Sequence, residues 1–207
     1  MSKATNADEF IARQRAAIAA NPDCGNSHYN LGVALMGKKE YDEAEKVLMM
    51  AIECSPSLAE AYVSIGGICL QRGDLDGCLD WNRRATKARP GFSEGWGNIG
   101  FVHLQRGEVD DAITAFKKAT TFNFRFVQAF ASMATAYLIK GMVDESIAAS
   151  EKALKLAPEF AVAHNNIGIA YLQKGDKAQA KTHIEKARDL GYEVAPEILA
   201  ELSDNQL

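Results

Sequence analysis

The sequence predicts an all-α solenoid, in which similar helical units stack along the chain, and three observations support this fold class. First, a small residue recurs every 34 residues, at Gly32, Gly66, Gly100, Ala134 and Gly168. Second, the residue 19 positions further on is always alanine, at Ala51, Ala85, Ala119, Ala153 and Ala187. Third, large apolar residues within each block are three and four apart, as in Tyr62, Ile65 and Cys69, which places them on one helical face. A period of this length indicates units that bury their apolar faces by stacking on their neighbours.

Each block is expected to contain two helices joined by a short turn. Glycine accepts the left-handed conformation that often ends a helix, and it ends the first helix of blocks two to five, at Gly73, Gly107, Gly141 and Gly175. Lys39 occupies this place in the first block and predicts a less favourable turn. Acidic residues suit the start of the second helix, and they follow the turns at Asp74, Asp76, Asp110 and Asp144. Proline stops the second helix at Pro56, Pro90 and Pro158.

The blocks resemble the tetratricopeptide repeat (TPR) family, which has an aromatic residue at position 4, an aliphatic at 7 and a small residue at 8. This chain has His28-Leu31-Gly32, Tyr62-Ile65-Gly66, Trp96-Ile99-Gly100, Phe130-Met133-Ala134 and His164-Ile167-Gly168. Position 20 should be small, and reads Ala44, Cys78, Ala112, Ser146 and Ala180. Position 24 should be large and apolar, as Leu48, Phe116 and Ile184 are, whereas Asn82 and Ser150 depart from the pattern and predict looser packing in blocks two and four. Phe124 and Tyr192 replace the closing proline.

The resemblance implies a right-handed α-solenoid of about five TPR units forming a single domain, residues 1–207. The repeats are expected at 25–58, 59–92, 93–126, 127–160 and 161–194. Residues 5–24 should form an N-terminal capping helix, helical over roughly 5–21, because Phe10, Ala17 and Pro22 match the second half of a repeat. Residues 195–207 should form a C-terminal capping helix and tail, opened by Pro196, since proline is favourable at the first helical position. Residues 203–207 are expected to fray.

Composition and cysteine usage exclude some classes of function. The net charge of −4 argues against a nucleic-acid backbone as the main partner. The four cysteines show no zinc spacing; Cys69 and Cys78 are expected to be buried, reduced thiols, with a disulfide or a metal as the alternative. Neither an apolar segment near the N-terminus nor a stretch of membrane-spanning length is present, so we expect a cytoplasmic protein without membrane insertion.

Catalysis is not expected, and neither a cofactor nor a metal is predicted. His28, His103 and His164 replace packing aromatics, and His183 lies on a second helix, so all four are interpreted as structural. The glycines recur at repeat spacing and form no phosphate-binding loop, and no Ser or Cys lies in a nucleophile-elbow sequence.

The resemblance further implies a concave groove lined by the first helices, where a partner would bind. Position 6 reads Asn30, Ser64, Asn98, Ser132 and Asn166, and position 9 reads Val33, Gly67, Phe101, Thr135 and Ile169. An asparagine row can pair with the backbone of an extended peptide, or it can satisfy neighbouring helix ends; both interpretations stay open. The mostly apolar floor also suits an amphipathic helix. Lys and Arg are absent from these two positions, so a clamp for a C-terminal carboxylate is not expected.

Two further patterns have alternative interpretations. Position 14 is basic in every block, at Lys38, Arg72, Arg106, Lys140 and Lys174. These cations suit helix C-termini, or they attract an acidic partner. Phe122, Phe124 and Phe126 are expected to pack between repeats, and an exposed one would mark a partner site.

The predicted function is therefore a non-catalytic adaptor that binds a peptide or helix of another protein. The alternative is a structural module that self-assembles when a terminal helix, carrying Ile198, Leu199 and Leu202, inserts into the next molecule.

Overall fold

The computed structural model describes residues 3–203, and all regular structure within that range is helical. Most of the segment expected to fray, 203–207, lies outside the described residues. The helices are α1 (Lys3–Ala20), α2 (Gly25–Gly37), α3 (Tyr41–Cys54), α4 (Ala59–Gln71), α5 (Leu75–Ala88), α6 (Ser93–Gln105), α7 (Val109–Phe122), α8 (Val127–Ile139), α9 (Val143–Leu156), α10 (Ala161–Gln173), α11 (Lys177–Asp189) and α12 (Pro196–Ser203). Pro196 opens the last helix, as predicted.

The fold class is all-α, as predicted, and the chain divides into two compact units, Met1–Val102 and His103–Leu207. The boundary falls within α6, and each unit is described by itself. The assignment of residues 1–207 to a single domain stays a prediction.

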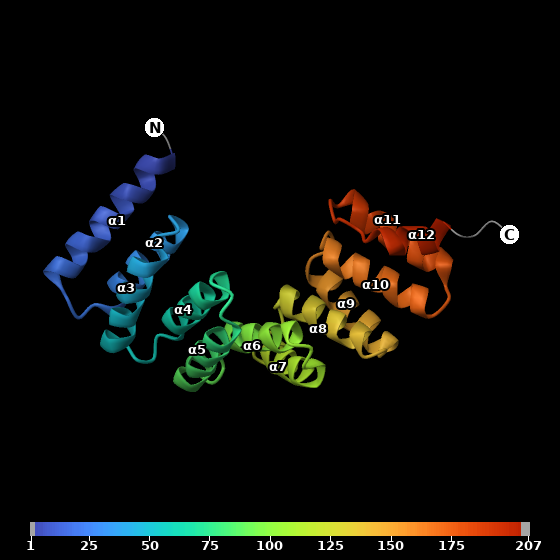
Figure 1. Ribbon diagram of the computed structural model, residues 1–207, viewed down its shortest axis with the longest axis horizontal. Helices are drawn as coiled ribbons and strands as arrows, with labels where there is room; N and C mark the ends of the chain where they lie inside the picture. Colours follow the sequence, from blue (N-terminus) through green and yellow to red (C-terminus); the bar gives the residue numbers. More distant parts are fainter. Residues whose placement is uncertain (1–2, 204–207) are drawn as a thin grey trace. The chain divides into compact units, whose positions relative to one another are not determined.

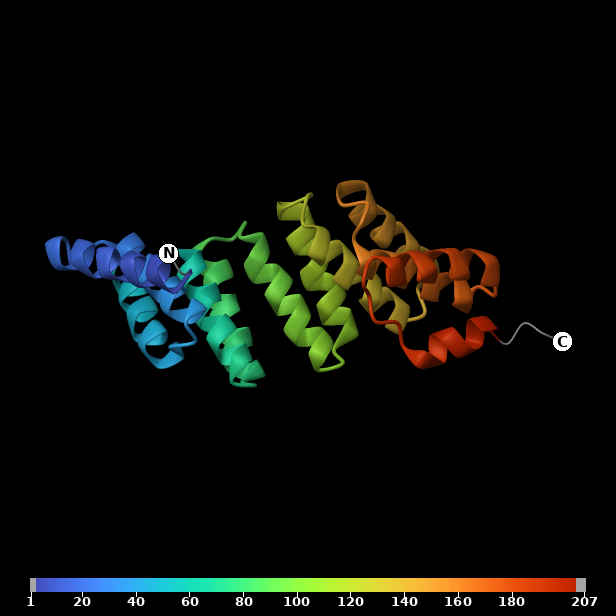
Figure 2. The ribbon, with the colours of Figure 1, turned by 90° about the horizontal axis from the view of Figure 1, so that it is seen from above.

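The first unit is built from helical hairpins (Figures 1 and 2). Helix α2 pairs with α3 and α4 pairs with α5, while α1 packs on α2 and α3 packs on α4. Its core contains Leu35, Leu48, Ile65 and Ile68, which have no exposed surface. Helix α1 therefore packs on α2 as α3 packs on α4.

The second unit repeats this arrangement. Helix α8 pairs with α9 and α10 pairs with α11, α7 packs on α8, and α9 packs on α10 (Figure 1). Phe116 and Ile184 are each 1% exposed and anchor this core. Helix α12 touches α11 and contributes no buried residue. Among the described residues, no helix combines the length and apolar character needed to span a bilayer.

The turns between paired helices have the predicted left-handed residue. Gly73, Gly107, Gly141 and Gly175 have φ angles of 75°, 73°, 73° and 78°. Lys39 adopts the same conformation with φ 64°, which is unfavourable for a residue with a Cβ atom. Asp74 then caps α5 by accepting a hydrogen bond from the Gly77 amide at 2.8 Å.

The side chains at positions 8 and 24 of a repeat are complementary in size, a small one facing a large one. A Cβ atom placed on Gly32 would lie 2.6 Å from Leu48 Cγ, and one on Gly168 would lie 2.6 Å from Ile184 Cδ1. In the fourth block the pair is Ala134 and Ser150, a larger residue opposite a smaller one, and both are completely buried. Ser150 thus departs from the family pattern in the block where Ala134 already carries a methyl group. Its hydroxyl is buried and has no hydrogen-bond partner within residues 3–203.

Asn82, the other departure at position 24, is integrated by polar contacts rather than apolar ones. It is completely buried, and its amide donates to the Cys78 carbonyl oxygen at 2.8 Å. Its Oδ1 accepts a hydrogen bond from Asn98 Nδ2 at 3.0 Å. The looser packing expected from the sequence is therefore replaced here by a hydrogen-bonded link between α5 and α6.

Candidate functional site: the faces of the first helices

Six of the ten predicted groove residues lie in the first unit, two on each of three helices: Asn30 and Val33 on α2, Ser64 and Gly67 on α4, and Asn98 and Phe101 on α6. The members of each pair are three residues apart and so share a helical face. Val33 is 42% exposed and Phe101 is 36% exposed, which makes both available for apolar contact. Asn30 is also exposed, whereas Ser64, Gly67 and Asn98 are half-buried.

A hollow of about 560 Å³ opens between α1 and α2 beside this face. Phe10 of α1 and Tyr29, Asn30 and Val33 of α2 line it. Phe10 is 37% exposed, so the hollow has apolar walls that are open to a ligand. Burial, followed by the negative charge of Glu60, raises the pKa of the Tyr29 hydroxyl, which therefore stays protonated at neutral pH.

The asparagine row does not offer uniform hydrogen-bonding capacity. Asn30 is exposed and its side chain has no hydrogen-bond partner among the described residues. Asn98 donates its amide to Asn82, as described above. Asn166 is 3% exposed and donates to the Ala131 carbonyl oxygen at 3.0 Å. Of the two interpretations left open by the sequence, internal pairing accounts for Asn98 and Asn166, while Asn30 is free to pair with a partner's backbone.

The other four predicted groove residues lie on α8 and α10 of the second unit, at Ser132, Thr135, Asn166 and Ile169. Asn166 also donates to Thr135 Oγ1 at 3.1 Å, which ties α10 to α8. Ser132 Oγ accepts a hydrogen bond from Gln128 at 3.4 Å. Ile169 is half-buried, so this face is more polar and more internally bonded than that of the first unit.

The basic residues at position 14 form ion pairs with the aspartate 30 residues earlier. Lys38 Nζ lies 2.9 Å from Asp8, Arg72 Nη2 lies 2.7 Å from Asp42, and Lys174 Nζ lies 2.6 Å from Asp144. Lys140 pairs with Asp110 in the same way. Hydrogen bonding to these carboxylates raises the pKa of Lys38 and of Lys174. The alternative that the stripe attracts an acidic partner loses its support, because at these four positions the cations are already paired.

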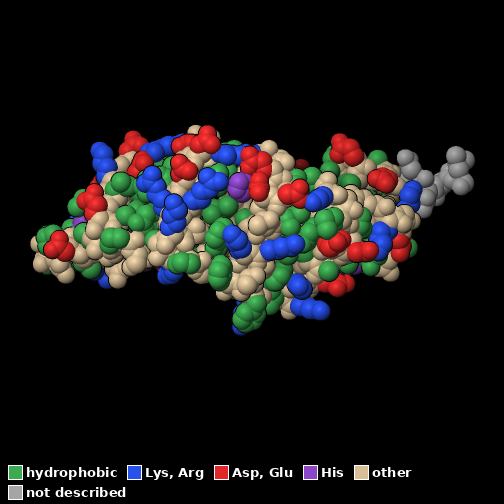
Figure 3. Space-filling model, turned by 90° about the horizontal axis from the view of Figure 1, so that it is seen from below, with side chains coloured by type: hydrophobic (Ala, Val, Ile, Leu, Met, Phe, Trp, Pro, Cys, Tyr) green, Lys and Arg blue, Asp and Glu red, His purple; other side chains and the backbone are tan. Residues whose placement is uncertain are grey.

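Charges of both signs are interspersed with hydrophobic side chains on the face drawn in Figure 3. This mixture agrees with the small net charge of −4. A nucleic-acid footprint requires a concentration of Lys and Arg on one surface, so this face gives it no support.

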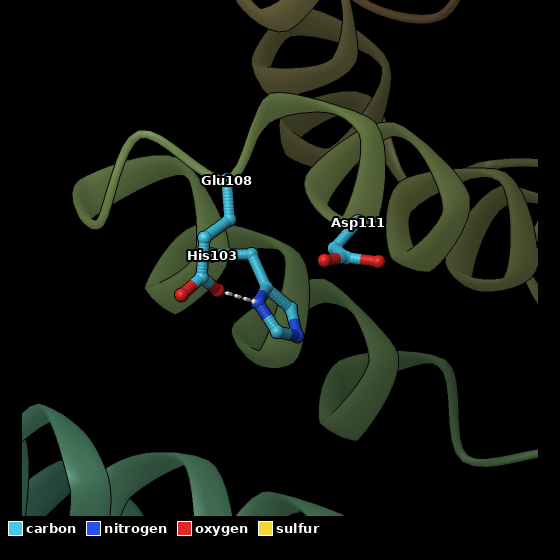
Figure 4. Close-up of side chains that lie close together, drawn as sticks. All are labelled: His103, Glu108 and Asp111. Carbon is cyan, nitrogen blue, oxygen red and sulfur yellow. Dashed lines mark hydrogen bonds and ion pairs between the residues drawn. The ribbon is translucent and has the colours of Figure 1, made fainter.

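One cluster of side chains has the composition of a metal site. Ligand atoms of His103, Glu108 and Asp111 lie within 4.8 Å of one another (Figure 4). His103 Nδ1 is hydrogen-bonded to a Glu108 carboxylate oxygen, which joins the end of α6 to the residue before α7. Since this bond accounts for the position of both side chains, the cluster gives no argument for a bound ion.

The remaining histidines also have structural contacts. The Nε2 atom of His28 is 2.7 Å from the Pro22 carbonyl oxygen, and the Nε2 atom of His164 is 3.1 Å from that of Pro158. His164 Nδ1 lies 3.2 Å from His183 Nδ1. Burial, and then the neighbouring His164, lower the pKa of His183. Both predicted buried thiols, Cys69 and Cys78, are indeed buried.

Three models of one family match the sequence. A model described as "TPR repeat" matches residues 134–175, one described as "Tetratricopeptide repeat" matches 11–59, and another with that description matches 93–125 and 161–190. Together they support a general role in protein binding. No curated protein sequence matches the chain.

Solved TPR structures share the fold. YrrB, described as a TPR protein with an unusual peptide-binding site, is 21% identical with a TM-score of 0.69, over 86% of this chain and 92% of YrrB. MamA is 22% identical with a TM-score of 0.68, over 77% of this chain and 94% of MamA. Pseudomonas aeruginosa pilF is 15% identical with a TM-score of 0.76, over 87% and 82%. At identities this low, the similarity shows a shared fold and does not extend to function.

Proposed function

Because this chain belongs to the tetratricopeptide repeat family, we propose that it is a non-catalytic adaptor or scaffold that holds a peptide or helix of a partner protein in its groove. Repeat proteins of this kind present extended binding surfaces rather than enclosed pockets. The architecture alone names no partner, so the proposal depends on what the groove face offers.

The observation that carries the proposal is the combination of exposed apolar side chains with a free amide in the first unit. Val33 and Phe101 are 42% and 36% exposed, and the hollow of about 560 Å³ beside α2 can accept a partner's apolar side chain. Asn30 supplies a donor and an acceptor at the edge of the hollow. This arrangement suits a peptide or helix that inserts an apolar anchor while pairing its backbone with Asn30.

The other predicted residues take supporting roles in this proposal. Ser64, Gly67 and Asn98 form the half-buried part of the first unit's face, and Gly67 leaves room because a Cβ atom there would meet only Met36 Cε, at 3.7 Å. Ser132, Thr135 and Ile169 are proposed as partner-contacting residues of the second unit, and the buried Asn166 as the residue that holds α10 against α8 behind them. The description of YrrB supports the proposal by analogy, since a peptide-binding site occurs there in a similar fold.

The test compares two double variants in affinity capture from a lysate of the cells that express the protein. Val33→Ser with Phe101→Ser removes the exposed apolar groups of the groove face, whereas Met49→Ser with Met50→Ser removes exposed apolar groups of α3. The control methionines are 37% and 44% exposed, so the two variants lose similar apolar surface. We expect the groove variant to lose a partner that wild type and the methionine variant both retain. Retention of every partner by the groove variant would show that the groove face is not the binding surface.

A second candidate function is self-assembly through the C-terminal helix. Helix α12 has no buried residue, and Leu199 is 38% exposed. Insertion of this helix into a second copy would be a head-to-tail contact and would build open chains. Sedimentation velocity of Leu199→Glu separates this function from the adaptor, because assemblies should disappear while partner capture persists. Ala200→Glu adds the same charge on the same helix without removing a large apolar group, and serves as the control. A wild-type protein that sediments as a monomer at high concentration would exclude self-assembly.

A further inference from the structure

A second hydrophobic surface lies in the second unit, where α7 is followed by the turn into α8. Phe124 is 75% exposed and Phe122 is 50% exposed. The prediction that these two residues pack between repeats is therefore wrong. Phe124 borders a hollow of about 470 Å³, whose other walls include Phe130 of α8 and Leu156 of α9. Leu156 is itself 38% exposed. Exposed apolar groups that gather at a hollow mark an interaction site more often than scattered ones do.

The turn holds Phe124 in a defined position. Asn123 Oδ1 accepts a hydrogen bond from the Arg125 amide at 3.0 Å, and the Asn123 carbonyl oxygen accepts one from the Phe126 amide at 3.1 Å. The Asn123 amide in turn donates to the Ala119 carbonyl oxygen of α7 at 2.9 Å. Because these bonds fix the backbone of the turn, little backbone entropy is lost when a partner covers Phe124.

Two lysines make the charge around the hollow positive, and one of them, Lys152, has its ammonium group 5.8 Å from the centre of the Phe130 ring. Lys152 and Lys155 line it, both are exposed, and neither has an ion pair among the described residues. Lys140 and Lys174 of the same unit are both paired with aspartate, so the two lysines at the hollow differ from those that link the repeats.

The hydroxyl groups at the hollow are already satisfied. Thr120 Oγ1 donates to the Phe116 carbonyl oxygen at 3.0 Å, and Thr121 Oγ1 donates to that of Lys117 at 2.7 Å. The hollow therefore presents apolar walls and two lysine ammonium groups to a ligand.

We propose that this surface, formed by Phe124, Leu156, Lys152 and Lys155, binds an acidic segment of a partner protein, with a bulky apolar side chain in the hollow and carboxylates on the two lysines. The charge selects carboxylates, since ammonium groups that have no ion pair among the described residues attract them and repel basic segments. The hollow of about 470 Å³ can receive an apolar side chain that projects from a protein segment, whereas a bilayer presents a flat surface. The proposal is independent of the groove, because none of these four residues belongs to it.

A phage-displayed library of random short peptides, selected on the immobilised full chain, supplies the probe. The selected phage are then passed over immobilised Phe124→Ser variant, and those that bind it are discarded. We expect the enriched peptides to combine a large apolar residue with nearby Asp or Glu. Synthetic copies of these peptides should bind wild type with a dissociation constant that rises about tenfold or more in Phe124→Ser, as truncation of a central aromatic anchor does.

Matched variants separate the surface from general effects on the fold. Phe122→Ser removes a second exposed phenylalanine that does not line the hollow, and it should leave peptide affinity unchanged. Lys155→Glu should weaken binding and reduce its salt dependence, whereas Lys186→Glu, an exposed lysine of α11, should not. The circular dichroism spectrum of each variant verifies that the helices persist.

Four results would overturn the proposal. Enriched peptides without carboxylates, or equal binding to Phe124→Ser and wild type, would show that the surface does not select acidic segments. Co-sedimentation with phosphatidylserine-rich vesicles that is lost in Phe124→Ser, without peptide enrichment, would assign the surface to anionic membranes. A dimer in sedimentation velocity that dissociates in Phe124→Ser would assign it to a second copy of the chain.

Discussion

The close contact between Gly168 and Ile184 predicts that substitutions at these two positions are strongly coupled. A Cβ atom on residue 168 would lie 2.6 Å from both Cδ1 and Cγ1 of Ile184, closer than packed carbon atoms can approach. Gly168→Ala should therefore force Ile184 to shift, at a cost of about 1–3 kcal/mol for overpacking. Alanine also favours the helix over glycine by about 1 kcal/mol, so the single variant should be near neutral to destabilised by about 2 kcal/mol.

Removing the obstructing side chain should reverse the sign of this effect. Ile184 is 1% exposed, so Ile184→Ala alone should cost about 2–5 kcal/mol through lost burial and the resulting cavity. In that background the atom nearest to the added Cβ is the Ala180 carbonyl oxygen at 3.2 Å. Gly168→Ala should then be tolerated or stabilising by up to about 1 kcal/mol. The predicted coupling free energy between the two sites is the overpacking cost that Ile184→Ala removes, about 1–3 kcal/mol.

A double-mutant cycle measured by urea denaturation, monitored by far-ultraviolet circular dichroism, provides this value. Hydrogen exchange of the α10 and α11 amides then verifies that the change is local, because each repeat contacts, and so stabilises, mainly its neighbours. Gly37→Ala is the control, since nothing lies within 4 Å of a Cβ atom there. A coupling free energy below about 0.5 kcal/mol, the usual error of additivity, would refute the size-matching argument.

Three further predictions follow from the second unit. Ser150→Ala and Ser146→Ala should each stabilise the protein by on the order of 1 kcal/mol in urea denaturation, because each removes a buried hydroxyl that has no hydrogen-bond partner in the described part of the chain. A loss of stability in either variant would contradict this. The pKa of His183 is lowered from its ordinary value of 6.5, so the unfolded chain binds more protons below that pH. Stability should accordingly be complete above pH 6.5 and fall as the pH drops towards the folded-state pKa, and His183→Gln should lose this component of the pH profile. Lys174→Met should lower the melting temperature only slightly, and the difference should vanish at high salt, because its pair with Asp144 is exposed.

Most of the fold could be predicted from the 34-residue period and from the residue types at the turns. Left-handed glycine at Gly73 and a helix opened by Pro196 follow from local rules, because each depends on the conformational range of one residue. The depth at which Asn82 is buried did not follow from such rules. Asn82 Oδ1 accepts a hydrogen bond from Asn98, which lies 16 residues away on the next helix. Only the packing of one repeat on the next brings these two side chains together.

The candidate site was less predictable because side-chain partners decide it. Position 6 identified Asn30 and Asn166 equally, yet one is exposed and the other is bonded to Ala131. The exposure of Phe124 could not be read from its hydrophobicity, which by itself favours burial. The pairing of Lys174 with Asp144 did have a sequence signal, namely a basic and an acidic residue 30 apart that recur with the repeat.

The recurring ion pair has an evolutionary consequence. In the fourth block, Lys140 pairs with an aspartate of the preceding block and Asp144 pairs with a lysine of the following block. Arg72 of the second block likewise pairs with an aspartate of the first. An in-frame duplication of 34 residues would therefore bring both complementary ends with it, wherever in the block it began. The chain can therefore lengthen or shorten by whole units without leaving either charge of this ion pair unmatched at the new junction.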